Sequence, residues 1–309
     1  MLPTQTINPH VLQEFITSNE AILRPKFPDA KIITKYGRPR IGLRWVIVAI
    51  CVFARSQNIV WRDLPPKLYY CDFLIEEGYL TRIPSKSTFH RMWVQVSKAN
   101  LNSWIKRIGY EDSNFSIEDL VVDSSGFEIR SGSVWRYIKW QRSYLSKNSK
   151  MFRKVHLAIA LPSRAIVGIY ISKIEKYDSK ALGPLLVRTS KRLIRKIKRF
   201  HADKAYWDNK IIGWCTQEGI TPVIPCKSNS VDHGTSSPID LLVRQQRKIP
   251  GLYRRNNKIY LRAEVEHVFG EVKLQYPIIR DRKNHNKHKS LLCQFLWYNH
   301  KNRIRRLRI

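Results

Sequence analysis

The stretch DLVVDSSGFEI, residues 119–129, decides the fold. Its apolar pair, Val121 and Val122, leads directly into Asp123, which two serines and a glycine follow. Apolar β-branched residues ahead of small polar ones are typical of a buried strand that ends in a turn. The carboxylate at the end of such a strand has to be hydrogen-bonded, paired or bound to a metal ion, because burying it alone is unfavourable. A turn-forming aspartate is the alternative interpretation, and these residues alone favour neither.

The same arrangement recurs in KRFHADKAYWD, residues 198–208. A strand-like run over 199–202 ends in Asp203, ahead of a helix that Asp208 or Asn209 helps to begin. Functional sites in α/β sheets gather at strand ends of this kind. Two strands that each end in an acid therefore predict one shared site.

A third acid is expected in YLRAEVEHVFGEVKLQY, residues 260–276, where valines recur at helical spacing. Three glutamates compete for the role: Glu264, Glu266 and Glu271. At about 100° per residue, only Glu266 shares a helix face with both Arg262 and Lys273. An ordinary ion pair on a solvated helix is the alternative.

Together, these three acids suggest a metal site for reactions at phosphate groups. Three carboxylates can bind two Mg²⁺ ions about 3.5–4 Å apart, which suits in-line displacement at a phosphate. We therefore predict that Asp123, Asp203 and Glu266 are the catalytic residues and the metal ligands. Arg262 and Lys273 would then bind DNA phosphates, the arginine as a planar fork and the lysine as a point charge.

The sequence around the acids predicts a mixed sheet. Further strand-like runs occur at 154–163, 165–173 and 221–227, with helical stretches at 179–195 and 208–218. Three hairpin-connected strands followed by strand and helix in alternation give an α/β architecture, a mixed five-stranded sheet flanked by helices. Residues from about 228 to 258 begin polar and rich in Gly, Ser and Pro, and a loop is expected there.

The amino-terminal third predicts a small all-α domain. Helical segments near 9–20, 41–56, 67–79 and 86–106 are separated by proline-containing breaks. The last two resemble a helix-turn-helix, in which Ser85 or Ser87 caps a helix carrying Lys86 and Arg91; a plain packing pair is the alternative. We therefore divide the chain into a helical DNA-binding domain, 1–117, and a catalytic domain, 118–309.

The charge predicts a nucleic-acid partner. Lys and Arg number 56 against 24 acids, a net charge of +32, and the 9 Trp, 14 Tyr and 11 Phe are unlike a ribosome-type protein. The basic run at 187–200 and the basic tail after Pro277 could follow a DNA backbone, and Lys154 could reach the site from the second strand. The tail includes a helix expected to pack on the sheet, and residues 300–309 are expected to lie on DNA or to be disordered.

The chain is expected to be soluble and to remain inside the cell. It lacks the basic start and apolar run of a signal peptide, and its longest apolar stretch is too short to span a bilayer of about 30 Å. The five cysteines contain no C-x-x-C pair, so neither a zinc site nor a disulfide framework is predicted.

Seven motifs together resemble one family. They are WRDLP at 61–65, VVDSSG at 121–126, KVH at 154–156, YDSKAL at 177–182, HADKAYWD at 201–208, GITPVIPCKSN at 219–229, and R-x3-E-x6-K at Arg262, Glu266 and Lys273. In order and spacing the chain resembles, nearly end to end, the DDE transposases of prokaryotic insertion sequences, in the group called insertion-sequence four and five. The family's extended signature has a tyrosine three positions before the arginine, where this chain has Ile259 followed by Tyr260.

The resemblance implies an RNase H-like core and assigns the triad to Asp123, Asp203 and Glu266. It implies two Mg²⁺ or Mn²⁺ ions as cofactor, and double-stranded DNA as partner in the form of terminal inverted repeats and target DNA. Cleavage would be followed by transfer of the 3′-hydroxyl into the target. It also implies a homodimer on DNA, in the cytoplasm of a prokaryote at its nucleoid. A catalytically inactive or domesticated DNA-binding relative and an RNase H-like nuclease or resolvase are the alternative functions.

Overall fold

The computed structural model describes residues 6–29, 41–111, 117–128, 152–173, 176–189, 191–275, 279, 281 and 284–307. The chain forms two compact units, Met1–Trp104 with Lys283–His300, and Ile105–Arg282 with Lys301–Ile309. This differs from the expected division near residue 117, because residues 283–300 belong to the helical unit. Trp297, for example, lies 5.5 Å from Phe15 and 5.3 Å from Phe53, measured between ring centroids.

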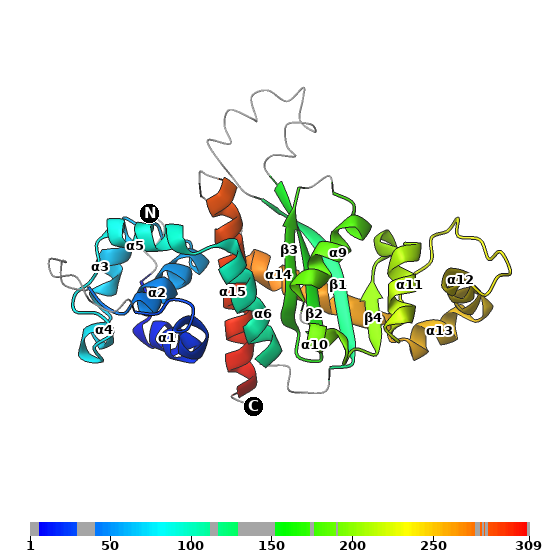
Figure 1. Cartoon of the computed structure of the whole chain (residues 1–309), viewed down its shortest axis with the longest axis horizontal. Helices are drawn as coiled ribbons and strands as arrows, with labels where there is room; N and C mark the ends of the chain where they lie inside the picture. The colour runs from blue at the N-terminus through cyan, green and yellow to red at the C-terminus, as the bar shows by residue number, and fades with distance from the viewer. Residues whose placement is uncertain are drawn as a thin grey trace, which may run out of the picture. The chain divides into compact units, whose positions relative to one another are not determined.

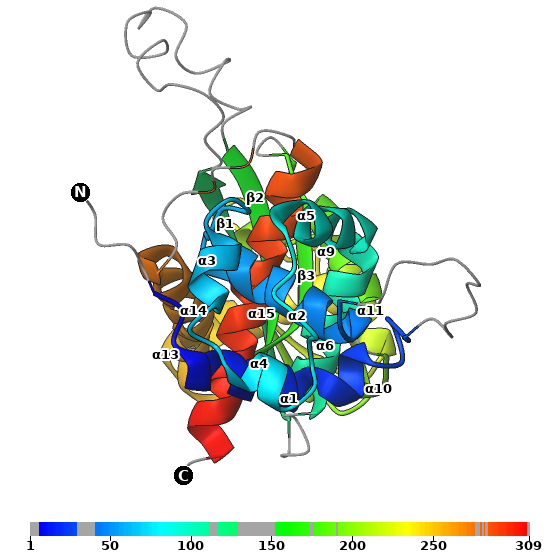
Figure 2. The same cartoon turned by 90° about the vertical axis from the view of Figure 1, so that its left-hand side faces the viewer.

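The described residues of the first unit form helices, with one isolated bridge between Gly42 and Leu80 (Figure 2). Its helices are α1 (Pro9–Leu23), α2 (Arg44–Ser56), α3 (Leu64–Leu68), α4 (Phe73–Glu76), α5 (Lys86–Gln95), the start of α6 (Lys98–Glu111) and most of α15 (Asn284–Leu307). Helix α1 begins at Pro9 because the Asn8 side chain accepts the Val11 N–H at 3.3 Å, and proline suits the first helical position. Helix α2 is buried from Trp45 to Ser56 and forms the centre of this unit.

Two expected helices of this unit are wrong in their bounds. The segment 67–79 contains the end of α3 and all of α4 instead of one helix; α3 starts earlier than expected, at Leu64, because Pro65 and Pro66 fit the first turn of a helix. The segment 86–106 breaks after Gln95, because Val96 is extended and Ser97 caps a new helix by accepting the Asn100 N–H at 3.0 Å. The short helix α5, with Ser85 as its N-cap, therefore stands apart from α6.

The second unit contains the five-stranded mixed sheet that the sequence predicts (Figure 1). Its strands are β1 (Asp119–Glu128), β2 (Phe152–Leu161), β3 (Ala165–Ser172), β4 (Arg199–Ala202) and β5 (Thr221–Val223). They lie in the order β3-β2-β1-β4-β5, with β1, β2 and β3 antiparallel in sequence. Strand β4 runs parallel to β1 and β5 runs parallel to β4, so the carboxyl ends of β1 and β4 lie at one edge.

Helices cover the sheet on both faces. Helix α9 (Asp178–Arg188) packs on β2 and β3 in front of the strands of Figure 1, and α14 (Ala263–Gln275) packs on β1 behind them. The expected helix over 179–195 ends at Arg188, since Thr189 is extended, and a short α10 (Lys191–Ile194) follows. Helix α11 (Asn209–Gln217) connects β4 to β5. The apolar core of this unit includes Leu120, Val122, Leu182, Leu185 and Phe200.

The loop expected at about 228–258 is wrong in its second half. It contains α12 (Pro238–Lys248) and α13 (Pro250–Asn256), and a short helical turn, η4 (Ile259–Arg262), follows. Ser237 caps α12 by accepting the Asp240 N–H at 3.3 Å, and the next turns bury Leu242 and Val243. Composition favoured a loop, but a serine cap followed by proline and apolar residues at helical spacing was the stronger signal.

The carboxyl-terminal segment is also more ordered than expected. Helix α15 continues to Leu307, so disorder is the wrong one of the two alternatives for residues 300–307, and contact of this segment with DNA stays a prediction. Glu271 of α14 stabilises this end, because Arg305 Nη1 lies 3.0 Å and Lys301 Nζ 3.8 Å from its Oε1. In the part of the chain that is described, no helix combines the length and the apolar character needed to cross a membrane.

A glycine on β3 allows α9 to lie close to the sheet. A Cβ at Gly168 would collide with Thr189 Oγ1 and would lie 3.3 Å from the Ala158 side chain. We expect Gly168→Ala to lower the free energy of unfolding by about 1–3 kcal/mol, because overpacking forces α9 outward. Denaturant unfolding should show this loss and its partial recovery in Gly168→Ala/Thr189→Ala, which removes the colliding oxygen. Equal stability of Gly168→Ala and the wild type would show that α9 is not tightly seated.

Candidate active site

The two aspartates predicted to share a site follow paired residues of neighbouring parallel strands. Val122 of β1 is in register with Ala202 of β4. The next residue along the chain is an aspartate in both cases, Asp123 after β1 residue Val122 and Asp203 after Ala202. Both carboxylates are anchored locally: Asp123 Oδ1 accepts the Ser124 N–H at 2.7 Å, and Asp203 Oδ1 accepts the Lys204 N–H at 2.7 Å. The parallel register thus places both acids at the same edge of the sheet.

Helix α14 places the third acid on the Asp123 face of β1. Side chains alternate along a strand, so Asp123, Ser125 and Phe127 share one face. Two contacts show that this face meets α14: Lys273 Nζ donates to Ser125 Oγ at 2.6 Å, and the Phe269 ring lies 6.0 Å from that of Phe127. Glu266 lies on the same side of α14 as Phe269 and Lys273, at helical spacing.

Asp123 is in an electrostatic field that the other two acids help to create. The pKa of Asp123 is raised to about 6, chiefly by burial and also by the negative charges of Asp203 and Glu266, while the Ser124 N–H and Arg262 act to lower it. Arg262 Nη1 donates to Asp203 Oδ1 at 2.8 Å. Glu266 is exposed, and no ion pair or hydrogen bond reaches its carboxylate among the described residues. The charges of Asp203, Glu266 and Arg262 thus all act on the Asp123 carboxylate.

The chemistry of these donors suits a hard divalent cation. Carboxylate oxygens are the ligands that Mg²⁺ and Mn²⁺ prefer. Burial and two neighbouring negative charges disfavour the ionised form of Asp123, and a bound cation would stabilise that form. The three carboxylates are not, however, gathered at ligand spacing: within the described ranges, no group of three or more His, Cys, Asp or Glu side chains could hold a metal ion. The arginine at Asp203 supplies the positive charge in this arrangement.

The predicted phosphate-binding residues fall into three environments. Arg262 and Lys273 lie beside the acids, as described above. Lys154 is on the opposite face, where its Nζ pairs with Asp178 Oδ1 at 2.8 Å. Lys86 and Arg91 are exposed on α5 of the first unit. The structure therefore brings two of the five together with the carboxylates.

Asp178, the first residue of α9, is a residue that sequence reasoning missed. Its Oδ1 accepts the Ser124 hydroxyl at 2.7 Å and lies 3.5 Å from His156 Nδ1. Burial lowers the pKa of His156 to about 4, so this imidazole is neutral at pH 7. The motif YDSKAL contained the signal, since an acid in the first turn of a helix is stabilised there by the helix dipole.

Another buried acid on β1 is fully partnered. Asp119 accepts Arg199 Nη2 at 2.9 Å and lies 2.8 Å from His201 Nε2. This cluster is at the start of β1, four residues before Asp123, so the two acids lie at different positions along the strand. Its arginine satisfies the carboxylate, and we assign it a structural role.

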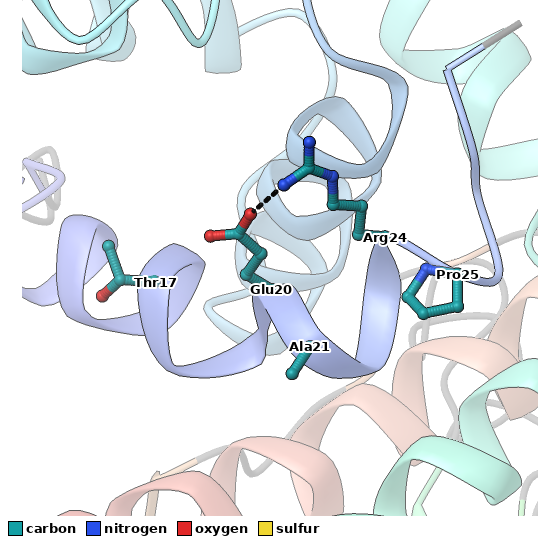
Figure 3. A pocket seen from close by; sticks show the side chains of 5 residues that line it. All are labelled: Thr17, Glu20, Ala21, Arg24 and Pro25. Atoms are coloured by element: carbon teal, nitrogen blue, oxygen red, sulfur yellow. Dashed lines mark hydrogen bonds and ion pairs between the residues drawn. The ribbon is translucent and has the colours of Figure 1, made fainter.

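A surface pocket on the first unit carries no comparable chemistry (Figure 3). It is lined by Thr17, Glu20, Ala21, Arg24 and Pro25. Its two charged residues, Glu20 and Arg24, pair with each other at 2.9 Å, and neither side chain is buried. The acids of the second unit therefore remain the candidate active site.

The comparisons with known proteins identify the family of the chain. The mixed sheet with flanking helices is consistent with an RNase H-like transposase fold. A family model described as the transposase DDE domain matches residues 114–299. The chain belongs to this family, whose members generally use divalent metal ions.

Among solved structures, the chain is similar to a piggyBac transposase synaptic complex with hairpin DNA. The identity is 10% and the TM-score 0.44, over 97% of this chain and 75% of that one, and a likeness of this degree carries no argument. No curated protein matches the chain.

Proposed function

We propose that the protein cuts DNA at the terminal inverted repeats of an insertion sequence and joins the 3′-hydroxyl to target DNA. The observation that carries this proposal is the meeting of Asp123, Asp203 and Glu266 in one electrostatic field, on three elements of a transposase-family domain. A binding-only relative would not need two acids at the ends of neighbouring parallel strands beside a helix that bears a third.

Each residue has a role in this proposal. The three carboxylates hold Mg²⁺ or Mn²⁺, and two such ions would activate the attacking oxygen and stabilise the leaving oxygen. Arg262 donates one N–H to Asp203 and keeps further donors for a DNA phosphate. Lys273, exposed and held against Ser125 and the Phe127 ring, offers a second cation next to the acids.

We propose that the first unit binds DNA through the exposed face of α5. Lys86, Ser87, His90, Arg91 and Val94 are all exposed, and their spacing places them on one face of this helix. Cations with polar and small apolar side chains on one helix face suit a DNA groove. The strong positive charge of the whole chain supports the same partner.

Removing both cations of this face should weaken DNA binding. We expect Lys86→Ala/Arg91→Ala to lower the affinity about tenfold or more, and to reduce the slope of log affinity against log salt by about 2. Fluorescence anisotropy over a salt series measures both quantities. Arg24→Ala/Arg62→Ala, which removes two exposed cations elsewhere on the same unit, is the matched control. An equal loss in both double variants would mean that α5 has no special role.

The function is tested with a labelled DNA fragment that ends in the element's inverted repeat. Cleavage should require Mg²⁺ or Mn²⁺ and should not occur in Ca²⁺ or chelator. Binding without cleavage under every condition would favour a DNA-binding relative that lacks activity. Cleavage of branched DNA irrespective of its sequence would favour a resolvase.

We also propose that a homodimer bridges two DNA ends, in a prokaryotic cytoplasm at the nucleoid. Insertion-sequence chemistry supports it, because both ends of an element have to be processed together. Native mass measurement of the DNA complex should give two chains per two ends, and a single chain on each end would contradict it.

A further inference from the structure

The face of β1 opposite to the three acids has a built polar arrangement of its own. Ser124 and Gly126 face this side, because side chains alternate from Asp123. Here α9 begins at Asp178, whose side chain is 14% exposed. A carboxylate this enclosed needs partners, and it has them on two strands.

Asp178 joins β1, β2 and α9. From β1 the Ser124 hydroxyl donates to its Oδ1 at 2.7 Å. From β2 the Lys154 ammonium lies 2.8 Å from Oδ1 and donates to Oδ2 at 3.0 Å. Lys154 itself is only 20% exposed, so this pair is much less screened than a surface ion pair. The positive end of the α9 dipole further favours the Asp178 charge.

Ser124 connects this cluster to the active site. Its backbone N–H donates to Asp123 Oδ1 at 2.7 Å, and its hydroxyl donates to Asp178. Ser124 therefore donates hydrogen bonds to two acids, one on each face of the sheet. Without Asp178 the Ser124 side chain would lose this hydrogen bond, and only the pairing of β1 with β2 would still position the N–H that orients the Asp123 carboxylate.

We propose that Asp178 is a positioning residue, which acts through Ser124 to orient the Asp123 carboxylate for metal binding. This inference rests on the proposed function, because it assumes that Asp123 is a metal ligand. It also gives Lys154 a different role from phosphate binding: its ammonium fixes Asp178 from β2. Removing a residue that orients a metal ligand without touching the metal typically lowers metal affinity by about 10- to 100-fold.

The test is Mn²⁺ binding to the DNA-free protein, measured by electron paramagnetic resonance. Asp178→Asn keeps the shape of the side chain and removes its charge. We expect Mn²⁺ affinity about tenfold weaker or more, with cleavage that recovers toward the wild-type rate as Mn²⁺ is raised. Asp208→Asn is the matched control, since Asp208 caps α11 by accepting the Lys210 N–H and asparagine caps equally well.

A double-mutant cycle with Ser124→Ala separates positioning from general loss of structure. Because both changes break one linkage, Asp178→Asn/Ser124→Ala should bind Mn²⁺ about as weakly as either single variant. Additive losses, or wild-type affinity in Asp178→Asn, would overturn the inference and leave the proposed function intact. A wild type that neither binds Mn²⁺ nor cuts DNA would overturn both.

Discussion

Replacement of Glu266 by glutamine is expected to abolish DNA cleavage and to leave binding to the inverted repeat unchanged. The substitution keeps the shape of the side chain and removes the charge that a metal ion requires. Bound metal ions contribute several kcal/mol of transition-state stabilisation, so the rate should fall about a thousandfold or more. Glu266 is exposed, and the described residues offer it no ion pair, so the fold should not suffer.

Glu264→Gln is the matched control on the same helix. Glu264 pairs with Arg164 and points away from the other acids, so its loss should leave cleavage within about twofold of wild type. Gel-based cleavage and anisotropy binding with all three proteins measure both properties. Comparable cleavage by Glu266→Gln and the wild type would remove Glu266 from the site.

Asp123→Asn is expected to abolish cleavage and at the same time to stabilise the metal-free protein. The folded-state pKa of Asp123, about 6, lies above its ordinary value of 3.8, so the folded protein prefers the protonated acid. Above pH 6 the ionised carboxylate destabilises the fold, and asparagine removes this cost. A shift of this size corresponds to about 2–3 kcal/mol in the free energy of unfolding near pH 7.

The pH dependence of the free energy of unfolding follows from the upward direction of this pKa shift. The stability that protonated Asp123 contributes is present below about pH 4 and is lost as the pH rises through 6. Denaturant unfolding should therefore show the largest advantage of Asp123→Asn above pH 6 and almost none at pH 4. Added Mn²⁺ should stabilise the wild type and not the variant. A variant less stable than the metal-free wild type at pH 7 would contradict this description of Asp123.

The sheet could be predicted because each of its parts has a local signal. Strand-like runs gave all five strands in order, and Asp123 and Asp203 at two strand ends indicated which strands meet. The helix face shared by Arg262, Glu266 and Lys273 follows from sequence spacing alone, and the contacts of Lys273 and Phe269 with β1 agree with it. These are properties of neighbouring residues, which a sequence shows directly.

The remainder depends on contacts between distant residues. Asp178 meets Ser124 and Lys154 across 54 and 24 positions of the chain, and no local pattern reveals such a cluster. In the last turns of α15, Arg305 pairs with Glu271 of α14, a contact across the sequence that the basic composition of this segment does not reveal. Helices α12 and α13 were missed for another reason, since the cap at Ser237 was outweighed by the polar composition before it.

The position of the family's signature tyrosine could be read from the sequence, but its surroundings could not. Ile259 occupies that position and is partly buried against the core of the second unit, whereas the adjacent Tyr260 is 69% exposed. The sequence shows the replacement, and the structure shows that Tyr260 does not pack in its place.

The most direct test of the metal site is a crystal structure of the protein with Mn²⁺ and inverted-repeat DNA, with the ions located by anomalous scattering. The account predicts manganese bound by Asp123, Asp203 and Glu266, with Arg262 and Lys273 at the DNA backbone. Manganese bound elsewhere, or none at these carboxylates in crystals that contain DNA, would contradict it.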